Sequence, residues 1–370
     1  MGRIAVIDGL RGIAILGVIY HHVFYKLTPS GWHALSFHGF RIFPFTLLSN
    51  GYYGVTLFFL LSGVVLYLPY AEGTRKMTTL SDAWSFYKRR AFRLLPLLIG
   101  STLIAIVIRY EHEPFIIWTL FLKTMWKVFV PFTLKETTHY PEVNWVLWSL
   151  RVEIWYSIVF PILSVGIRRF GMNIIVLGTI AIDTAIRQTG YPHYEVSRLF
   201  FFDSFIPRLD AFVVGMAIAH ILCMKPQELQ KAWILPMGIA MVIAGFILSD
   251  INIIDGRAGP LSILYPPRIL AIIIGLTLLT GSLMSHRSTL ASILSFPMLR
   301  VIGMMSYSVY VWHSIILLSL SPLAGPRQAI LYCAILSTGS VLSFLVFEGG
   351  SFRKINEIFT KSPHRNINSS

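Results

Sequence analysis

Residues 5–25 read AVIDGLRGIAILGVIYHHVFY, an apolar stretch that could cross a bilayer as a helix yet contains Asp8, Arg11 and His22. Eleven positions separate Arg11 from His22. An α-helix turns about 100° per residue, so both side chains fall on one face, roughly 16 Å apart along the axis. His21 lies about 80° away from that line. Ionisable side chains are costly in lipid, so this stripe, which Asp8 extends, is a candidate functional site.

The rest of the chain is also apolar. Hydrophobic residues make up 55% of it and charged residues only 13%, whereas a soluble domain has about 25% charged residues. We therefore predict an all-α, polytopic integral membrane helical bundle with about ten transmembrane helices. The expected spans lie near residues 5–25, 50–69, 94–109, 145–166, 172–187, 207–224, 233–250, 264–284, 300–321 and 328–347. The run 115–132 contains Lys123 and Lys127, and we expect it to be interfacial or re-entrant.

We expect one transmembrane domain over residues 1–350 and a short cytoplasmic polar tail over 351–370. Lysine and arginine are more frequent on alternate connectors, which places both termini in the cytoplasm. The net charge of +14 is then loop charge that attracts anionic membrane lipids, and we expect no nucleic-acid partner. Asp8 and Arg11 interrupt the first apolar run, which argues against a cleaved signal peptide. The chain has two cysteines and no metal-ligand spacing, so we expect no metal.

The first apolar stretch offers acid–base chemistry. A neutral imidazole such as that of His22 is a good general base near neutral pH. The planar guanidinium of Arg11 matches phosphate geometry. The alternative is a helix-end arginine and an interfacial histidine with no chemical role, but the shared face and the nearby Asp8 favour the functional interpretation.

A second cluster, KRRAFRLLP, occupies residues 88–96. Arg89 and Arg93 are an i,i+4 pair, and Arg90 and Arg93 an i,i+3 pair. Anchoring of a cytoplasmic helix end explains most such runs. Pro96 at the expected start of a helix would in addition fix the entry turn and aim the arginines. We therefore predict an anion site suited to a nucleotide-like donor such as coenzyme A.

A third cluster places Ser149, Glu153 and Tyr156 at helical spacing. Glu153 should lie one to two turns inside the membrane, where an unpaired carboxylate is very unfavourable. It is therefore either one half of a helix–helix ion pair or a cavity-wall acid that orients a histidine or a substrate hydroxyl.

Two smaller signals lie further along the chain. Arg208 and Asp210 open a helix, where we favour an ion pair at the helix end. Ser306, Tyr310 and His313 form one polar stripe that could join helices by hydrogen bonds. The chain has no P-loop, dinucleotide fingerprint, His-Glu-x-x-His or Gly-x-Ser-x-Gly motif, which argues against a soluble hydrolase or a metalloenzyme.

Six blocks, in order and over nearly the whole length, resemble membrane acyltransferase family 3, the O-acyltransferases of bacterial surface polysaccharides. The blocks are IDGLRGIA at 7–14 with His22, LFFLLSG at 57–63, RRAFRLLP at 89–96, WSL at 148–150 with Glu153 and Tyr156, RLD at 208–210, and SYSVYVWH at 306–313. Two features depart from the family. Some relatives have a fused esterase-like domain for which this chain is too short, and Glu348 is followed by glycines where relatives often have Glu-x-Pro.

The resemblance implies transfer of an acyl group, usually acetyl, from cytoplasmic acyl-CoA to a sugar hydroxyl. The acceptor would be a lipid-linked saccharide on the far side of the bacterial inner membrane. Acyl-CoA would be a co-substrate, with no permanently bound cofactor. The essential pair of the family corresponds to Arg11 and His22, and its donor-binding pair to Arg90 and Arg93.

The site predicted from the residues and the resemblance together has three parts. The catalytic residues are His22, Arg11 and Glu153; the donor-binding residues are Arg89, Arg90 and Arg93; the supporting residues are Asp8, Ser149, Tyr156, Asp210, Tyr310 and His313. His22 could be a general base or could carry the acyl group briefly. A transporter or flippase of a lipid-linked saccharide is the rival class, and a small molecule such as a macrolide is an alternative acceptor.

Overall fold

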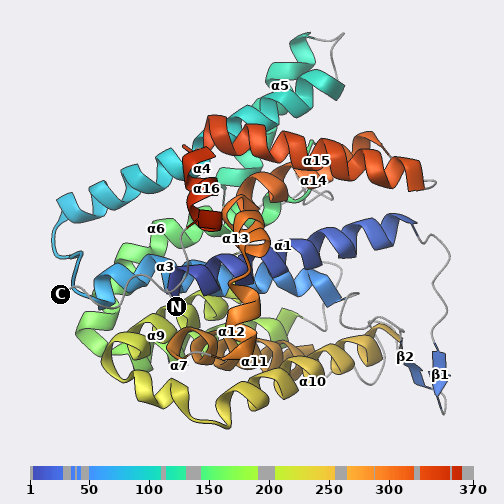
Figure 1. Ribbon diagram of the computed structural model, residues 1–370. Helices are drawn as coiled ribbons and strands as arrows, with labels where there is room; N and C mark the ends of the chain where they lie inside the picture. Colours follow the sequence, from blue (N-terminus) through green and yellow to red (C-terminus); the bar gives the residue numbers. More distant parts are fainter. Residues whose placement is uncertain are drawn as a thin grey trace. The chain divides into compact units, whose positions relative to one another are not determined.

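The computed structural model describes residues 3–27, 35–37, 40–42, 50–109, 114–130, 143–190, 205–254, 265–286, 288–320, 326–350 and 352–360. These residues are helical apart from connecting turns and a short hairpin, in which β1 (Leu35–Phe37) pairs antiparallel with β2 (Phe40–Ile42) (Figure 1). The predicted all-α fold is therefore confirmed. Part of the expected tail, residues 352–360, forms a short helix, and residues 361–370 lie outside the described ranges.

The chain divides into two compact units. The first unit comprises Met1–Leu68, Val214–Met304 and Glu357–Ser370. The second comprises Pro69–Val213 and Met305–Asn356. The first unit contains α1 (Arg3–Leu27), η1 (Asn50–Tyr53), most of α3 (Gly54–Ala71) and α9 (Leu209–Met224), η3 (Pro226–Gln230), α10 (Ile234–Ile254), α11 (Tyr265–Ser285), α12 (Thr289–Leu294) and α13 (Pro297–Met304). The second contains α4 (Leu80–Arg109), α5 (Pro114–Phe129), α6 (Leu147–Phe170), α7 (Met172–Gly190), η2 (Ile206–Arg208), α14 (Ser306–Ser319), α15 (Pro326–Phe347) and the start of α16 (Phe352–Thr360). The single domain predicted for residues 1–350 stays a prediction.

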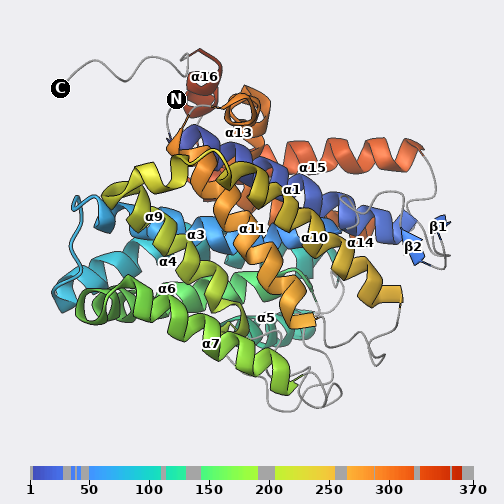
Figure 2. The same cartoon turned by 90° about the horizontal axis from the view of Figure 1, so that it is seen from below.

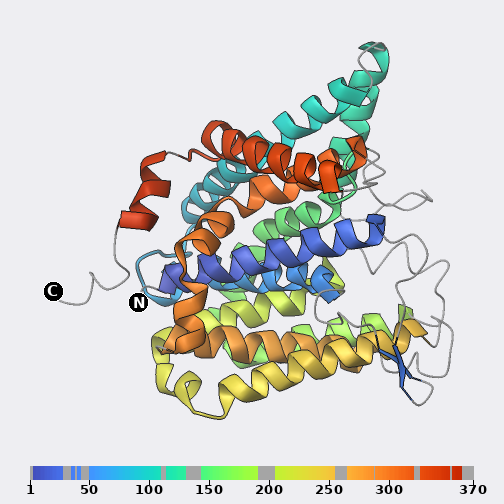
Figure 3. The same ribbon diagram turned by 45° about the vertical axis from the view of Figure 1, so that its right-hand side comes forward.

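In the first unit, α1 is held by close backbone contacts with α12 and α13 (Figure 1). A Cβ at Gly9 would lie 1.8 Å from the carbonyl oxygen of Leu294, and one at Gly303 would lie 1.7 Å from that of Asp8. Only glycine permits this approach, as in other tightly packed membrane helices. The helix that contains Arg11 is therefore fixed by backbone packing. α10 and α11 lie side by side in the same unit (Figure 3).

In the second unit, α4 begins at a capping box. The backbone N–H of Asp82 donates to Thr79 Oγ1 (3.1 Å), and Asp82 Oδ2 accepts from the backbone N–H of Thr79 (2.9 Å). The apolar side of α4 then packs against α5 and α6, and α6 lies beside α7 (Figure 2). This core consists of Leu94, Leu98, Val128, Leu147, Leu150 and Ile154.

The start of α4 differs from the prediction. A span was expected to begin near residue 94, with Pro96 fixing its entry turn, but the helix is continuous from Leu80 and Pro96 lies well inside it. The capping box explains the early start. Pro96 has no N–H, so it removes one helical hydrogen bond without ending the helix. The prediction that Pro96 marks a helix entry is therefore wrong.

Among the described residues, seven helices are long and apolar enough to cross a membrane, which supports a multi-pass membrane protein. The pair α13 and α14, interrupted at Met305, can be counted as an eighth span. Two shorter apolar helices, Met172–Ile186 and Ile234–Ser249, coincide with the two remaining predicted segments. Each of the ten segments thus contains an apolar helix. The number that cross the membrane and the side on which the termini lie stay predictions.

Candidate functional site

In the first unit, Arg11 and His22 lie on one uninterrupted helix, as the apolar run of residues 5–25 predicted. Both side chains are half-buried, and so is that of Asp8. His21 lies instead against Tyr52, with 5.1 Å between ring centroids, and its ring is 5.4 Å from that of His22. His21 thus takes part in an aromatic contact with η1 and has its ring edge-on to that of His22. The chemical roles predicted for Arg11 and His22 stay predictions.

In the second unit, Arg90 occupies a core position. The buried side of α4 contains Phe86, Arg90, Leu94, Leu97 and Leu98, which recur every three to four residues. An arginine in such an apolar stripe requires a buried partner for its charge and its donors.

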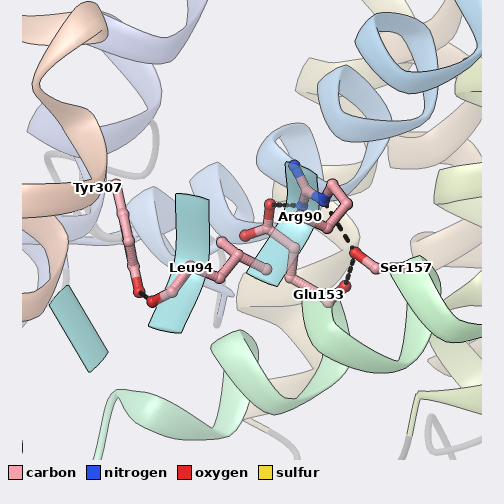
Figure 4. A network of polar contacts seen from close by, with 5 residues as sticks. All are labelled: Arg90, Leu94, Glu153, Ser157 and Tyr307. Carbon is pink, nitrogen blue, oxygen red and sulfur yellow. Dashed lines mark hydrogen bonds and ion pairs between the residues drawn. The ribbon is translucent and has the colours of Figure 1, made fainter. Parts of the chain in front are cut away.

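Glu153 and Ser157 of α6 provide these partners (Figure 4). The Arg90 Nη2 donates to Glu153 Oε1 at 2.7 Å, and the Arg90 Nε donates to Ser157 Oγ at 3.0 Å. Side-chain exposure is 10% for Arg90 and 27% for Glu153. Of the two interpretations of Glu153, the helix–helix ion pair is present, while the catalytic role predicted for Glu153 stays a prediction.

The neighbouring cations of α4 are oriented differently. Arg89 and Arg93 are exposed, whereas Arg90 between them is buried. Directly after Arg93, the carbonyl oxygen of Leu94 accepts a hydrogen bond from the Tyr307 hydroxyl at 2.8 Å (Figure 4). The three predicted donor-binding residues therefore do not form one uniform surface.

The polar stripe of α14 joins α6 one turn before Glu153. Ser149 Oγ donates to the Tyr310 hydroxyl at 2.6 Å, and the Tyr310 hydroxyl lies 3.2 Å from the carbonyl oxygen of Val146. His313 is fully buried, and its Nδ1 contacts the carbonyl oxygen of Tyr310. A carbonyl only accepts, so this contact places the proton on Nδ1. Tyr310 therefore joins α14 to α6 as predicted, whereas the His313 contact lies within α14, and the joining roles predicted for Ser306 and His313 stay predictions.

The third residue of the α6 stripe faces η2. The Tyr156 hydroxyl donates to the carbonyl oxygen of Arg208 at 2.5 Å, and the Arg208 guanidinium lies 4.6 Å from the ring centroid of Trp148. Asp210 is buried, and its backbone N–H donates to Asp183 Oδ2 at 2.7 Å. The contacts of Tyr156 and Asp210 thus join α6, α7 and the start of α9 within the second unit.

Sequence reasoning missed one buried carboxylate in this unit, that of Asp183, and assigned no role to a second, that of Glu348. Asp183 is fully buried on α7, and its one signal was an acid in an otherwise apolar run. Glu348 follows α15 and accepts hydrogen bonds from the backbone N–H and hydroxyl of Ser308, in the first turn of α14. An anionic group at a helix N-terminus is favourable, so Glu348 stabilises α14 although it lacks the expected Glu-x-Pro context.

The structure thus brings together Arg90 with Glu153 and Ser149 with Tyr310 and His313 in the second unit. Asp8, Arg11 and His22 belong to the first unit. Among the described residues, no group of three or more histidine, cysteine or acidic side chains could hold a metal ion.

A sequence model of the acyltransferase domain family matches residues 4–348. The "Putative O-acetyltransferase" of Staphylococcus aureus strain COL is 27% identical over 343 residues, covering 83% of this chain and 49% of that protein. The "Peptidoglycan O-acetyltransferase OatA" of Listeria monocytogenes is 23% identical over 376 residues, covering 96% of this chain and 56% of that protein. The chain therefore spans about half the length of these curated relatives. No solved structure matches the chain significantly.

Proposed function

Because the chain belongs to acyltransferase family 3, we propose that it is a membrane O-acyltransferase that moves an acetyl group from acetyl-CoA to a hydroxyl of a cell-surface saccharide. One observation carries the proposal. The residue types that this transfer needs, a base for the acceptor hydroxyl and cations for an anionic donor, lie on apolar helices inside the matched region. The names of the relatives support acetyl as the group and oxygen as the acceptor atom.

We assign proton transfer to His22 of α1. Its imidazole takes the proton of the acceptor hydroxyl while the hydroxyl oxygen attacks the thioester carbonyl carbon. The carbon–sulfur bond breaks, coenzyme A leaves as the thiolate and takes up a proton, and the new ester remains on the acceptor. Arg11 favours the anionic charge that develops during this step, because a guanidinium stabilises nearby negative charge.

We propose a saccharide as the acceptor. A lipid-linked precursor of a surface polysaccharide would suit a multi-pass membrane enzyme, and the name of the Listeria relative adds peptidoglycan as a second saccharide of this class. Both present sugar hydroxyls of similar chemistry. The acceptor is therefore best sought among cell-envelope glycans before small metabolites.

Mass spectrometry of envelope glycans from cells with and without the protein tests this proposal. Cells with the wild type should contain glycans heavier by one acetyl group, and His22→Ala should remove that gain while the protein remains folded and inserted. His286→Ala is the matched control, because this histidine is exposed and its Nδ1 contacts a backbone carbonyl oxygen, that of Ser282.

Two results would overturn the proposal. Unchanged glycan masses with altered amounts on the two sides of the membrane would indicate a transporter. Full acetylation by His22→Ala, together with normal expression, would remove the assigned base. If small metabolites were acetylated and glycans were not, the proposed acetyl transfer would stand, but the proposed saccharide acceptor would be wrong.

A further inference from the structure

The start of α4 presents its cations in two directions. Arg90 lies in the buried stripe between Phe86 and Leu94, whereas Arg89 and Arg93 are exposed. The helix is continuous through this segment, so the orientation of Arg93 depends on how the backbone around Arg90 is held. A residue that fixes Arg90 therefore also fixes the direction of Arg93.

Two neighbouring helices hold this segment (Figure 4). From α6, Glu153 accepts from Arg90 Nη2 and Ser157 accepts from Arg90 Nε. Ser157 in turn donates to the backbone carbonyl oxygen of Glu153 at 3.0 Å. From α14, Tyr307 donates to the carbonyl oxygen of Leu94. The helical turn that contains Arg93 is thus held by hydrogen bonds at both ends, through the Arg90 side chain and the carbonyl oxygen of Leu94.

The guanidinium groups of Arg90 and Arg93 differ in how readily a phosphate could reach them. Arg90 is neutralised by a carboxylate at 2.7 Å and is almost fully buried. A phosphate that bound Arg90 would have to displace Glu153 or share the guanidinium with it. Arg93 is exposed and one turn away, and it retains the planar fork that binds phosphate oxygens in pairs. The geometry therefore favours Arg93 over Arg90 as the ligand of an anionic group.

We propose that Glu153 is a positioning residue, which holds Arg90 in the bundle so that Arg93 meets a phosphate of the acyl donor. This inference rests on the proposed function for the identity of the donor. It assigns different roles to the two arginines: Arg90 sets the position of α4, and Arg93 binds the phosphate.

Exchange of the ion pair tests this division of roles. Arg90→Glu and Glu153→Arg should each raise the KM for acetyl-CoA at least tenfold, because each leaves like charges in contact. The double variant R90E/E153R restores opposite charges and should return the KM to within about threefold of the wild type. If Arg90 itself binds the phosphate, the double variant places a carboxylate there and no rescue will occur, which would overturn the proposal.

Arg93→Gln should raise the KM for acetyl-CoA at least tenfold with little change in kcat, since one charge-assisted contact is lost. Arg168→Gln, an exposed arginine near the end of α6, is the matched control and should leave the KM unchanged. A normal KM in Arg93→Gln would overturn the proposal. Size-exclusion profiles of all variants, with the milder Glu153→Gln, separate a positioning effect from failure to fold.

A lipid headgroup offers the same phosphate chemistry, so the variants are compared in phosphatidylcholine nanodiscs with and without phosphatidylglycerol. If the proposal is right, Arg93→Gln should raise the KM for acetyl-CoA in both membranes. A loss confined to the anionic membrane would assign Arg93 to lipid and overturn the donor role. Direct binding of coenzyme A to the same variants needs no turnover. An absence of acetyl transfer with the expected pattern of binding would therefore contradict only the proposed function.

Discussion

Replacement of Gly303 by alanine is the sharpest test of how α1 is held. An added Cβ would lie 1.7 Å from the carbonyl oxygen of Asp8 and 2.9 Å from the backbone nitrogen of Gly12, whereas ordinary contacts begin at 3.4 Å. α13 would have to move away from α1 by about 1.7 Å, because both obstacles are backbone atoms. Overpacking of this kind costs about 1–3 kcal/mol.

The matched control is Gly339→Ala in the middle of α15, where a Cβ would have no heavy atom within 4 Å. Alanine is favoured over glycine in a helix, so this variant should gain up to about 1 kcal/mol of stability. The two variants should therefore differ by about 1–4 kcal/mol in their free energy of unfolding. The difference can be measured by titrating the protein in mixed micelles with a denaturing detergent.

Acetyl transfer is the second readout of this pair. Gly303→Ala should reduce turnover more than Gly339→Ala does, since α1 contains Arg11 and the shifted contact lies at Asp8. The reasoning would be refuted if Gly303→Ala were as stable as Gly339→Ala and equally active. Close backbone packing would then not be what fixes α1.

Three further predictions concern single polar contacts of the second unit. Tyr310→Phe removes the hydroxyl that accepts a hydrogen bond from Ser149 and should cost about 1 kcal/mol of unfolding free energy. Adding Ser149→Ala to this variant should cause little further loss, because both changes remove the same hydrogen bond. Additive losses would contradict this hydrogen bond between Ser149 and Tyr310. Asp183→Ala leaves the buried backbone N–H of Asp210 without its acceptor and should cost about 1–3 kcal/mol in the same titration. Glu348→Gln removes the charge at the α14 N-terminus and should lower the thermal midpoint, whereas an unchanged midpoint would exclude a stabilising role.

The sequence predicted those features that depend on one helix alone. Hydropathy located an apolar helix in every expected segment, including the one helix that contains both Arg11 and His22. The start of α4 was missed because low hydropathy before residue 94 obscured a capping box at Thr79 and Asp82. A search for capping patterns would have found it.

Features that depend on two helices could be predicted only as alternatives. The expected depth of Glu153 in the membrane indicated that its carboxylate needs a partner, but it did not identify Arg90 as that partner. The buried stripe Phe86, Arg90, Leu94 does identify Arg90 once α4 is known to begin at Leu80. The partner of Asp183, in contrast, is a backbone N–H far along the chain, and no side-chain pattern identifies a backbone donor.

The stripe on α6 shows why such polar residues are useful in an apolar bundle. Ser149, Glu153 and Tyr156 share one side of the helix but contact three different elements, α14, α4 and η2. Apolar packing against lipid or neighbouring helices distinguishes poorly between rotations of a helix about its axis. A rotation by one residue, about 100°, would break all three contacts and leave each buried group unsatisfied at about 1–3 kcal/mol. The stripe therefore fixes the rotation of α6, and through Arg90 it also fixes the direction in which α4 presents Arg93.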